Sequence, residues 1–198
     1  MMDLMGRRSR RLALRDVGRV GDESSGSAFA RAYDEHVWHV YGYFAYRLPS
    51  RDDAEDLTQL TFERALKAWD RFDARRASVA TWLLAIARNL LVDHYRRDRS
   101  HRHEPLGDAE GEATLVHGED DPHTLGISPE LAAGLERLGQ REREVIALRF
   151  GGDLTGPEIA ELTGLSIVNV QQILSRSLRR LRAELERSQP AGKRRIPA

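Results

Sequence analysis

The sequence predicts an all-α protein that consists of two small helical domains joined by a flexible acidic linker. Apolar residues recur at helical spacing over long stretches, and no stretch alternates between apolar and polar residues as a half-buried strand does. Between the two periodic parts lies a segment rich in Gly, Pro, His and acidic residues that shows no periodicity. A chain of 198 residues is long enough for one or two domains of this kind.

Composition shifts divide the chain into five zones. Residues 1–26 form a basic and polar N-terminal extension that we expect to be disordered, and residues 188–198 form a loose tail. The first helical domain is expected over 27–99 and the second over 128–187. The acidic linker is expected at 100–127.

The first domain should contain long helices and the second domain shorter ones. Ser27 and Ser78 are the expected N-caps of the first and third helices, and Pro49 ends the first because it cannot donate a helical hydrogen bond. The helices are expected at about 27–48, 52–72, 78–97, 129–137, 141–150, 156–162 and 166–186. The apolar set of the first helix comprises Phe29, Tyr33, Val37, Val40 and Phe44.

The composition excludes several classes of protein. The 31 Lys and Arg residues are balanced by 31 Asp and Glu residues, so any nucleic-acid binding must come from local patches. The absence of Cys excludes disulfides and thiolate metal sites within the chain. The basic N-terminus lacks the apolar block of a signal peptide, and no run approaches the roughly 18 apolar residues of a membrane span. We therefore expect a cytoplasmic protein without membrane insertion.

The second predicted helix has one acidic face. At about 100° per residue, its acidic residues form a narrow stripe that only Lys67 interrupts. A face of one sign suits a basic partner, although many acidic faces contact only solvent. The stripe comprises Asp52, Asp56, Gln59, Glu63 and Asp70, and the opposite side comprises Leu57, Thr61, Ala65, Ala68 and Phe72.

The third predicted helix and the loop before it combine apolar and basic residues. Trp82 lies at the edge of the apolar stripe, either as a core residue or as a ring that stacks on a base. The stripe itself comprises Val79, Leu83, Ile86, Ala87 and Leu90. Clustered Arg residues neutralise phosphates and position a protein on DNA, or they simply contact solvent. The basic and polar set comprises Arg71, Arg75 and Arg76 in the loop and Arg88, Asn89, Arg96 and Arg99 on the helix.

Residues 157–178, PEIAELTGLSIVNVQQILSRSL, have the pattern of a helix-turn-helix. Gly164 supplies the turn, where a positive φ costs little, and Ser166 can cap the second helix. Ile159, Ala160 and Leu162 should face inward on the first helix, and Leu165 and Val170 should fix the second.

The second helix of this motif has a predicted buried side and a polar side. Gln can pair with adenine edges and Arg with guanine edges, so the polar side suits DNA recognition, with solvation alone as the alternative. The buried side comprises Val170, Ile173, Leu174, Leu178, Leu181 and Leu185. The candidate DNA contacts are Ser166, Asn169, Gln171, Gln172, Ser175, Arg176 and Arg179.

Three strings resemble the sigma-70 family, and in particular its small extracytoplasmic-function (ECF) sigma factors. They are DAEDLTQLTF at 53–62, TWLLAIARNLLVDHYRR at 81–97 and the helix-turn-helix. The resemblance covers about 27–99 and 129–186. It implies a protein that binds core RNA polymerase and directs promoter recognition and transcription initiation.

The resemblance also implies a partner for each surface. Asp52, Asp56, Gln59 and Glu63 would bind the clamp helices of the largest polymerase subunit, and the flap region would be a further contact. The loop and third helix would hold the non-template strand of the −10 element, with one base flipped into a pocket of the loop. The helix-turn-helix would bind the −35 element of promoter DNA. An anti-sigma factor is a further partner to be considered.

Two departures from the family pattern affect these contacts. Leu60 stands where the family usually has an acidic residue, which alters one edge of the docking face. Residues 169–173 are NVQQI where the family commonly has Thr-Val-Lys-Ser-Arg. The usual −35 contacts therefore do not transfer unchanged to this chain.

Other functions fit parts of the pattern. LuxR-type response regulators have a similar helix-turn-helix, so a stand-alone DNA-binding regulator is the main alternative, and an anti-sigma-like decoy that occupies polymerase is another. The chain has no P-loop, no GxGxxG and no evident Ser/Cys–His arrangement, so we expect no enzyme activity and no cofactor. No metal site is expected, because His101, His103, His117 and His123 lack a regular ligand spacing. The linker is either a plain spacer or an acidic mimic of phosphates in a basic polymerase channel.

Overall fold

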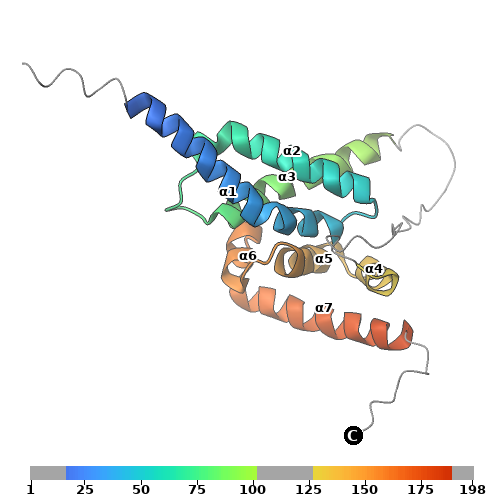
Figure 1. Cartoon of the computed structure of the whole chain (residues 1–198). Coiled ribbons are helices and arrows are strands. Elements are labelled where there is room, and N and C mark those ends of the chain that lie inside the picture. The colour runs from blue at the N-terminus through green and yellow to red at the C-terminus, as the bar shows by residue number, and fades with distance from the viewer. Residues whose placement is uncertain (1–16, 102–126, 189–198) are drawn as a thin grey trace, which may run out of the picture. The chain divides into compact units, whose positions relative to one another are not determined.

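The computed structural model describes residues 17–101 and 127–188, and the regular secondary structure of this part of the chain is entirely helical, with no strand (Figure 1). The all-α prediction is therefore confirmed. Most of the N-terminal extension, nearly all of the linker and the tail lie outside the described residues. The chain divides into two units, residues 1–35 and 36–198. The elements are α1 (Val17–Ala45), α2 (Arg51–Ala68), η1 (Trp69–Arg71), α3 (Val79–His101), α4 (Pro129–Glu136), α5 (Gln140–Ile146), η2 (Ala147–Gly151), α6 (Gly156–Thr163) and α7 (Ile167–Ser188).

The first helix differs from its prediction at the N-terminal end. It begins at Val17, so Ser27 lies inside the helix and is not its N-cap. Ser and Gly lower helix propensity by about 1 kcal/mol or less each, and an existing helix extends through such residues when no Pro interrupts it. Of the expected apolar set, Val40 and Phe44 are buried but Tyr33 is 44% exposed. The amphipathic Tyr ring tolerates the surface better than the aliphatic members of the set.

Helices α2 and α3 lie side by side (Figure 1). Ser50 caps α2 by accepting a hydrogen bond from the Asp53 amide at 3.1 Å, which the sequence analysis did not identify. The predicted cap Ser78 is confirmed, because its hydroxyl accepts from the Thr81 amide at 3.1 Å. The buried apolar residues of the pair are Ala54, Leu57, Phe62, Ala65, Leu83, Leu84, Ala87, Leu90 and Leu91.

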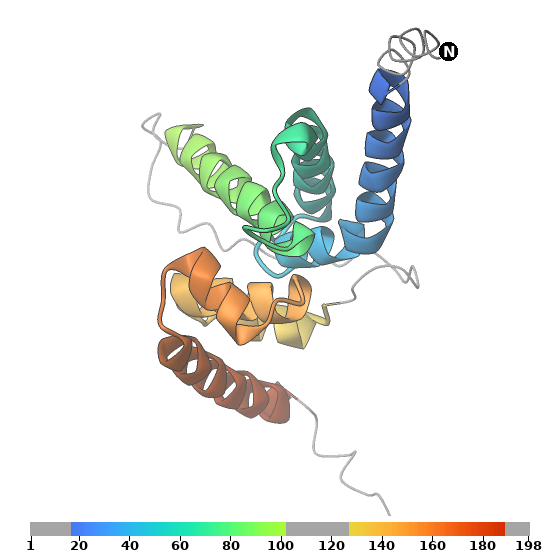
Figure 2. The ribbon, with the colours of Figure 1, turned by 90° about the vertical axis from the view of Figure 1, so that its left-hand side faces the viewer.

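The C-terminal helices begin and end close to the predicted positions, and α7 packs along α4, α5 and α6 (Figure 2). Leu135, Leu138, Ile146 and Leu181 form a buried apolar cluster in this part. The sequence did not predict that the helix containing α5 widens into the π-helical segment η2. Such segments arise where an extra residue is accommodated in the helix, which leaves no local sequence signature.

Residues far apart in the sequence meet inside the 36–198 unit. The Nε atom of Arg88 on α3 lies 2.6 Å from a carboxylate oxygen of Glu144 on α5. Gly151 lies directly against the backbone of Gly42, where a side chain would collide with main-chain atoms. Tyr46 packs on the apolar cluster of the C-terminal helices. The helices on either side of the predicted linker therefore contact one another directly.

Candidate functional site

The acidic stripe of α2 lies on the surface, as the helical spacing predicts. Asp52, Asp56, Gln59 and Glu63 are all exposed, and the Gln59 amide donates a hydrogen bond to Glu63 at 3.2 Å. The opposite side of α2 is buried, so the helix cannot rotate to hide the stripe. Leu66 is 57% exposed and lies three residues after Glu63, beside the acids. The acidic pattern alone did not indicate Leu66, although the spacing of Leu66 from Gln59 and Glu63 places it on the same side of the helix.

Buried hydroxyl groups on α2 are satisfied within the helix. The Oγ1 atoms of Thr58 and Thr61 donate to the carbonyls of Ala54 and Leu57, each at 2.7 Å. A buried hydroxyl without such a partner would cost about 1–3 kcal/mol. The acidic stripe is therefore carried by a fully packed helix.

Three aromatic rings hold the loop between α2 and α3. Ring centroids lie 5.5 Å apart for Trp69 and Phe72, 5.9 Å for Trp69 and Trp82, and 5.1 Å for Phe72 and Trp82. Such aromatic pairs are worth about 0.5–1.5 kcal/mol beyond their buried area. Trp82 therefore packs against the anchors of the loop, in agreement with the core role considered for it.

The loop itself presents basic side chains to solvent. Arg71, Arg75 and Arg76 are all exposed, as expected for phosphate contacts. Arg75 donates to Asp73 through Nε at 3.0 Å and Nη2 at 2.9 Å, and these hydrogen bonds lower the pKa of Asp73. Arg75 is thereby bound to Asp73 within the loop, while Arg71 and Arg76 extend the basic surface of the loop.

The basic residues of α3 are not equivalent. Asn89 and Arg96 are exposed, whereas Arg88 is only about one-third exposed and is bound to Glu144. The hydrogen bond to Glu144 raises the pKa of Arg88, so the guanidinium keeps its charge beside this carboxylate. In this conformation Arg88 contacts a carboxylate from α5, where the sequence predicts a phosphate contact.

The start of α3 also contacts the C-terminal helices. The Ser78 hydroxyl donates to Glu158 of α6 at 3.2 Å, and the Thr81 hydroxyl donates to the same carboxylate at 3.4 Å. Glu158 also accepts from the backbone and hydroxyl of Thr155 at 2.9 and 2.6 Å, which forms the capping box of α6. These hydrogen bonds, that from the Thr155 side chain above all, lower the pKa of Glu158.

Helices α6 and α7 form the predicted helix-turn-helix. Gly164 adopts φ of 72° at the turn, a conformation that other residues rarely adopt. Ser166 accepts a hydrogen bond from the Asn169 amide at 3.2 Å, so its predicted role as the cap of α7 is confirmed. Ile159 and Val170 are fully buried and join the two helices to the core.

The predicted DNA-contacting residues of α7 share one exposed surface. Ser166, Asn169, Gln171, Gln172, Ser175, Arg176 and Arg179 are all exposed. The preceding residues Ile167 and Val168 are exposed too, a feature that the sequence analysis did not single out.

The buried side of α7 differs from its prediction at one turn. Leu178, predicted to be buried, is 43% exposed, whereas Ser177 is completely buried. The buried stripe runs through Val170, Ser177 and Leu181, and at about 100° per residue Leu178 lies roughly 80° from its centre. The prediction from apolar character alone is therefore wrong for Leu178, because its neighbour Ser177 occupies the core.

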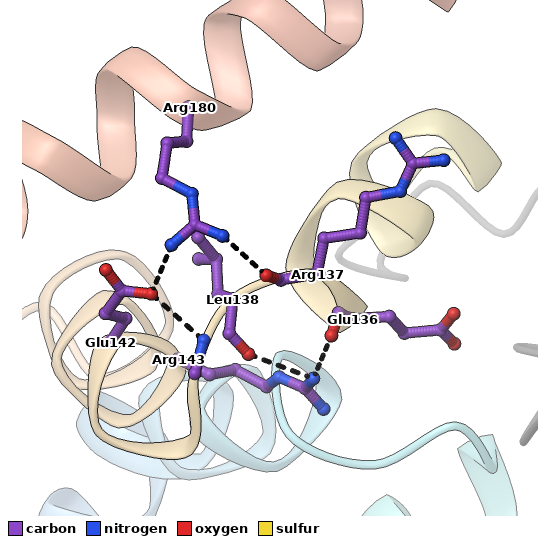
Figure 3. A network of polar contacts seen from close by, with 7 residues as sticks. Glu136, Arg137, Leu138, Glu142, Arg143 and Arg180 are labelled. Atoms are coloured by element: carbon purple, nitrogen blue, oxygen red, sulfur yellow. Dashed lines mark hydrogen bonds and ion pairs between the residues drawn. The ribbon is translucent and has the colours of Figure 1, made fainter.

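A polar network fixes α7 on the turn between α4 and α5 (Figure 3). The Arg180 guanidinium donates to Glu142 at 2.6 Å and to the carbonyl of Arg137 at 2.8 Å. Glu142 also accepts from the Gly139 amide at 2.9 Å, and Arg143 donates to the carbonyl of Glu136 at 2.8 Å. Because these contacts use the flank of α7, its exposed polar residues remain available to a ligand.

Family models match both halves of the chain. Residues 32–101 match sigma-70 region 2, which includes the acidic stripe and α3, and residues 134–183 match sigma-70 region 4, which includes the helix-turn-helix. Together the two matches cover more than half of the chain. The chain belongs to the sigma-70 family.

Relatives of this sigma-70 family member are ECF sigma factors. The ECF RNA polymerase sigma factor SigC of Mycobacterium tuberculosis is 34% identical over 80% of this chain and 82% of its own length. The ECF RNA polymerase sigma factor BldN of Streptomyces coelicolor is 31% identical over 78% of this chain, which spans 59% of BldN. The sigma factor RpoE of Bartonella quintana, solved with the anti-sigma factor NepR, has the same fold, with a TM-score of 0.62 at 21% identity over 82% of this chain and 99% of RpoE.

Two further observations concern the described residues alone. Within 17–101 and 127–188, no three His, Asp or Glu residues gather as a metal ion would need. No helix in the same ranges is long and apolar enough to cross a membrane. The four His residues considered as ligands in the sequence lie outside the described side chains.

Proposed function

We propose that this chain is a working ECF sigma factor that binds core RNA polymerase and directs transcription initiation at selected promoters. One observation carries the proposal: a chain that matches sigma-70 regions 2 and 4 exposes both an acidic docking stripe and a polar recognition helix. In this proposal polymerase performs the catalysis, and the chain acts in the cytoplasm, where polymerase and DNA are found.

The acidic stripe of α2 is the proposed polymerase contact. Asp52, Asp56 and Glu63 offer three carboxylates on one exposed face, and complementary charge speeds encounter and fixes orientation. The exposed Leu66 beside them offers apolar surface that the partner can bury. The clamp helices of the largest polymerase subunit are the proposed partner of this stripe.

The two DNA-binding surfaces have different tasks. Arg71 and Arg76, exposed on the loop that packs on Trp69, Phe72 and Trp82, are the proposed contacts to the phosphates of a separated −10 strand. On α7, the exposed Gln172 and Arg176 are the proposed contacts to base edges of the −35 element. The roles of the individual residues, and an anti-sigma partner of the kind solved with RpoE of Bartonella quintana, belong to this proposal.

The test is run-off transcription with core polymerase, with and without the chain. We expect a promoter-specific transcript only when both are present. A stand-alone regulator would bind its DNA site tightly without polymerase, and a decoy would bind polymerase but yield no specific transcript. Either of those results would refute the proposal.

A charge-reversal variant tests the docking stripe directly. The double substitution Asp56→Lys and Glu63→Lys should strongly weaken binding to core polymerase while the helical content stays unchanged, because exposed charges contribute little to folding. The matched control, Glu136→Lys with Glu186→Lys, changes net charge equally on other helices and should bind as wild type does. If both double variants bind polymerase equally well, α2 is not the docking surface.

A further inference from the structure

The first turn of α7 exposes two branched apolar side chains. Ile167 is 46% exposed and Val168 is 62% exposed, which makes Val168 the most exposed large hydrophobic residue in the described part of the chain. Ser166 caps this turn through the Asn169 amide, so both residues lie in ordered helix. Neither belongs to the polar set that the sequence predicts as DNA contacts.

Val168 heads a straight line of exposed residues on α7. Residues 168, 172, 175 and 179 follow the i, i+4, i+7 and i+11 spacing that places side chains above one another on a helix. With 3.6 residues per turn, Val168 lies about 160° around the helix from the buried stripe of Val170, Ser177 and Leu181. It therefore occupies the centre of the outward surface, one turn before Gln172.

Chemistry singles out one group on DNA for this side chain. The N-terminal residues of the second helix in a helix-turn-helix contact base edges in the major groove. Of the four bases, only thymine presents a methyl group there, and apolar side chains recognise it by contact. We propose that Val168 is a specificity-determining residue that recognises the C5-methyl group of a thymine in the −35 element. This inference rests on the proposed function, since it requires α7 to bind promoter DNA.

The surroundings of Val168 favour DNA over a protein partner. A protein-docking surface usually forms a contiguous apolar patch, often of several hundred Å². Here Asn169 and Gln172, which can hydrogen-bond bases, adjoin Val168, and Arg179 lies farther along the same line. The other large apolar residues exposed on α7, Ile167 and Leu178, lie on its flank, roughly 60° and 80° from the buried stripe.

The test removes a single methyl group from the DNA. The polymerase holoenzyme formed with the full chain first selects its preferred −35 element from a randomised promoter library. Each thymine of that element is then replaced by deoxyuridine, one at a time on each strand, and promoter affinity is measured by competition. At one position we expect wild type to bind about fourfold more weakly, the factor that corresponds to burial of one methyl-sized group.

Variants of Val168 should change that response. Val168→Ala should bind the thymine promoter about fourfold more weakly than wild type does. Replacing the thymine by deoxyuridine should then cause no further loss of affinity, because the effects of two groups in contact are not additive. Val168→Thr keeps one methyl group at the same place and should retain the discrimination. Leu178→Ala, which removes apolar surface about 15 Å farther along the same helix, should discriminate as wild type does.

Several results would overturn the inference. The first is that deoxyuridine leaves the affinity of wild type unchanged at every position. The second is that Val168→Ala still distinguishes thymine from deoxyuridine. The third is that the preferred −35 element contains no thymine. Weaker binding of Val168→Ala to core polymerase without DNA would show that Val168 contacts protein. Failure of the proposed function differs from failure of this inference alone. If the proposed function failed, no library member would give a specific transcript even before deoxyuridine is introduced, and the inference would fail too.

Discussion

Substitution of Gly151 by Ala tests the contact between the helices on either side of the linker. A Cβ atom at this position would lie 2.5 Å from the carbonyl carbon of Gly42 and 2.7 Å from the amide nitrogen of Tyr43. Favourable contacts between carbon atoms lie at about 3.5–4.0 Å, so one backbone must move by roughly 1 Å. The three nearest atoms all belong to the main chain, so movement of a flexible side chain cannot relieve the overlap.

The cost of this overlap is estimated from overpacked protein cores. Additional methyl groups in a tightly packed site typically cost about 1–3 kcal/mol. For a chain of this size, each kcal/mol lowers the melting temperature by about 2–4 °C. We therefore expect Gly151→Ala to melt roughly 2–12 °C below wild type in a thermal scan followed by circular dichroism.

The matched control is Gly156→Ala at the start of α6. A Cβ atom there would meet nothing within 4 Å, so this variant introduces no overlap. Ala lowers the conformational entropy of the unfolded chain and has a higher helix propensity than Gly, which together raise the unfolding free energy by up to about 1 kcal/mol. Gly156→Ala should be as stable as wild type or slightly more stable. If Gly151→Ala matched it, the backbones of Gly42 and Gly151 would not be in contact, and the packing of the 36–198 unit would be refuted.

Two other predictions concern polar groups of the C-terminal helices. Because the pKa of Glu158 is lowered from its ordinary value of 4.5, the carboxylate stabilises the fold above that pH and loses this effect as pH falls through the lower folded-state pKa. Urea unfolding should therefore show wild type more stable than Glu158→Gln at neutral pH, with the difference shrinking below about pH 4.5; a constant difference would contradict this. The Oγ atom of Ser177 is buried without a hydrogen-bond partner in the described structure, so Ser177→Ala should raise unfolding free energy by about 1 kcal/mol. A lower urea midpoint for Ser177→Ala would show that the hydroxyl is satisfied.

Local sequence signals predicted most of the helical structure. Ser78 and Ser166 cap the helices that follow them, and Gly164 adopts the positive φ that its place in the turn requires. Each of these features depends on residues within one helical turn, so it can be recognised without knowledge of the rest of the fold. The exposure of the α2 acids follows in the same way from helical spacing.

Two of the differences from the sequence prediction originate in packing between distant residues. The partner of Arg88 is Glu144, 56 positions later, and nothing near either residue in the sequence signals the pair. Apolar character placed Leu178 in the core, but the packing of α7 selected its smaller neighbour Ser177. Val168, the proposed thymine contact, has a different origin: it is apolar, whereas the sequence pattern of a DNA-contacting surface is polar. Sequence patterns thus indicate which face of a helix is polar, whereas tertiary packing decides where that face ends.

The two sides of α7 separate stability from specificity. Its position is fixed by Val170, Leu181 and the bonds of Arg180 to the α4–α5 turn, all of which avoid the exposed line headed by Val168. Exposed helix substitutions away from such features usually change stability by less than about 0.5 kcal/mol, whereas one lost base contact costs about 1–3 kcal/mol of discrimination. If α7 binds promoter DNA as proposed, substitutions on the exposed line would change the preferred promoter while the fold stays intact. This explains how a recognition helix with Gln171 and Gln172 in place of the usual basic and small residues can still be presented by an ordinary region 4 scaffold.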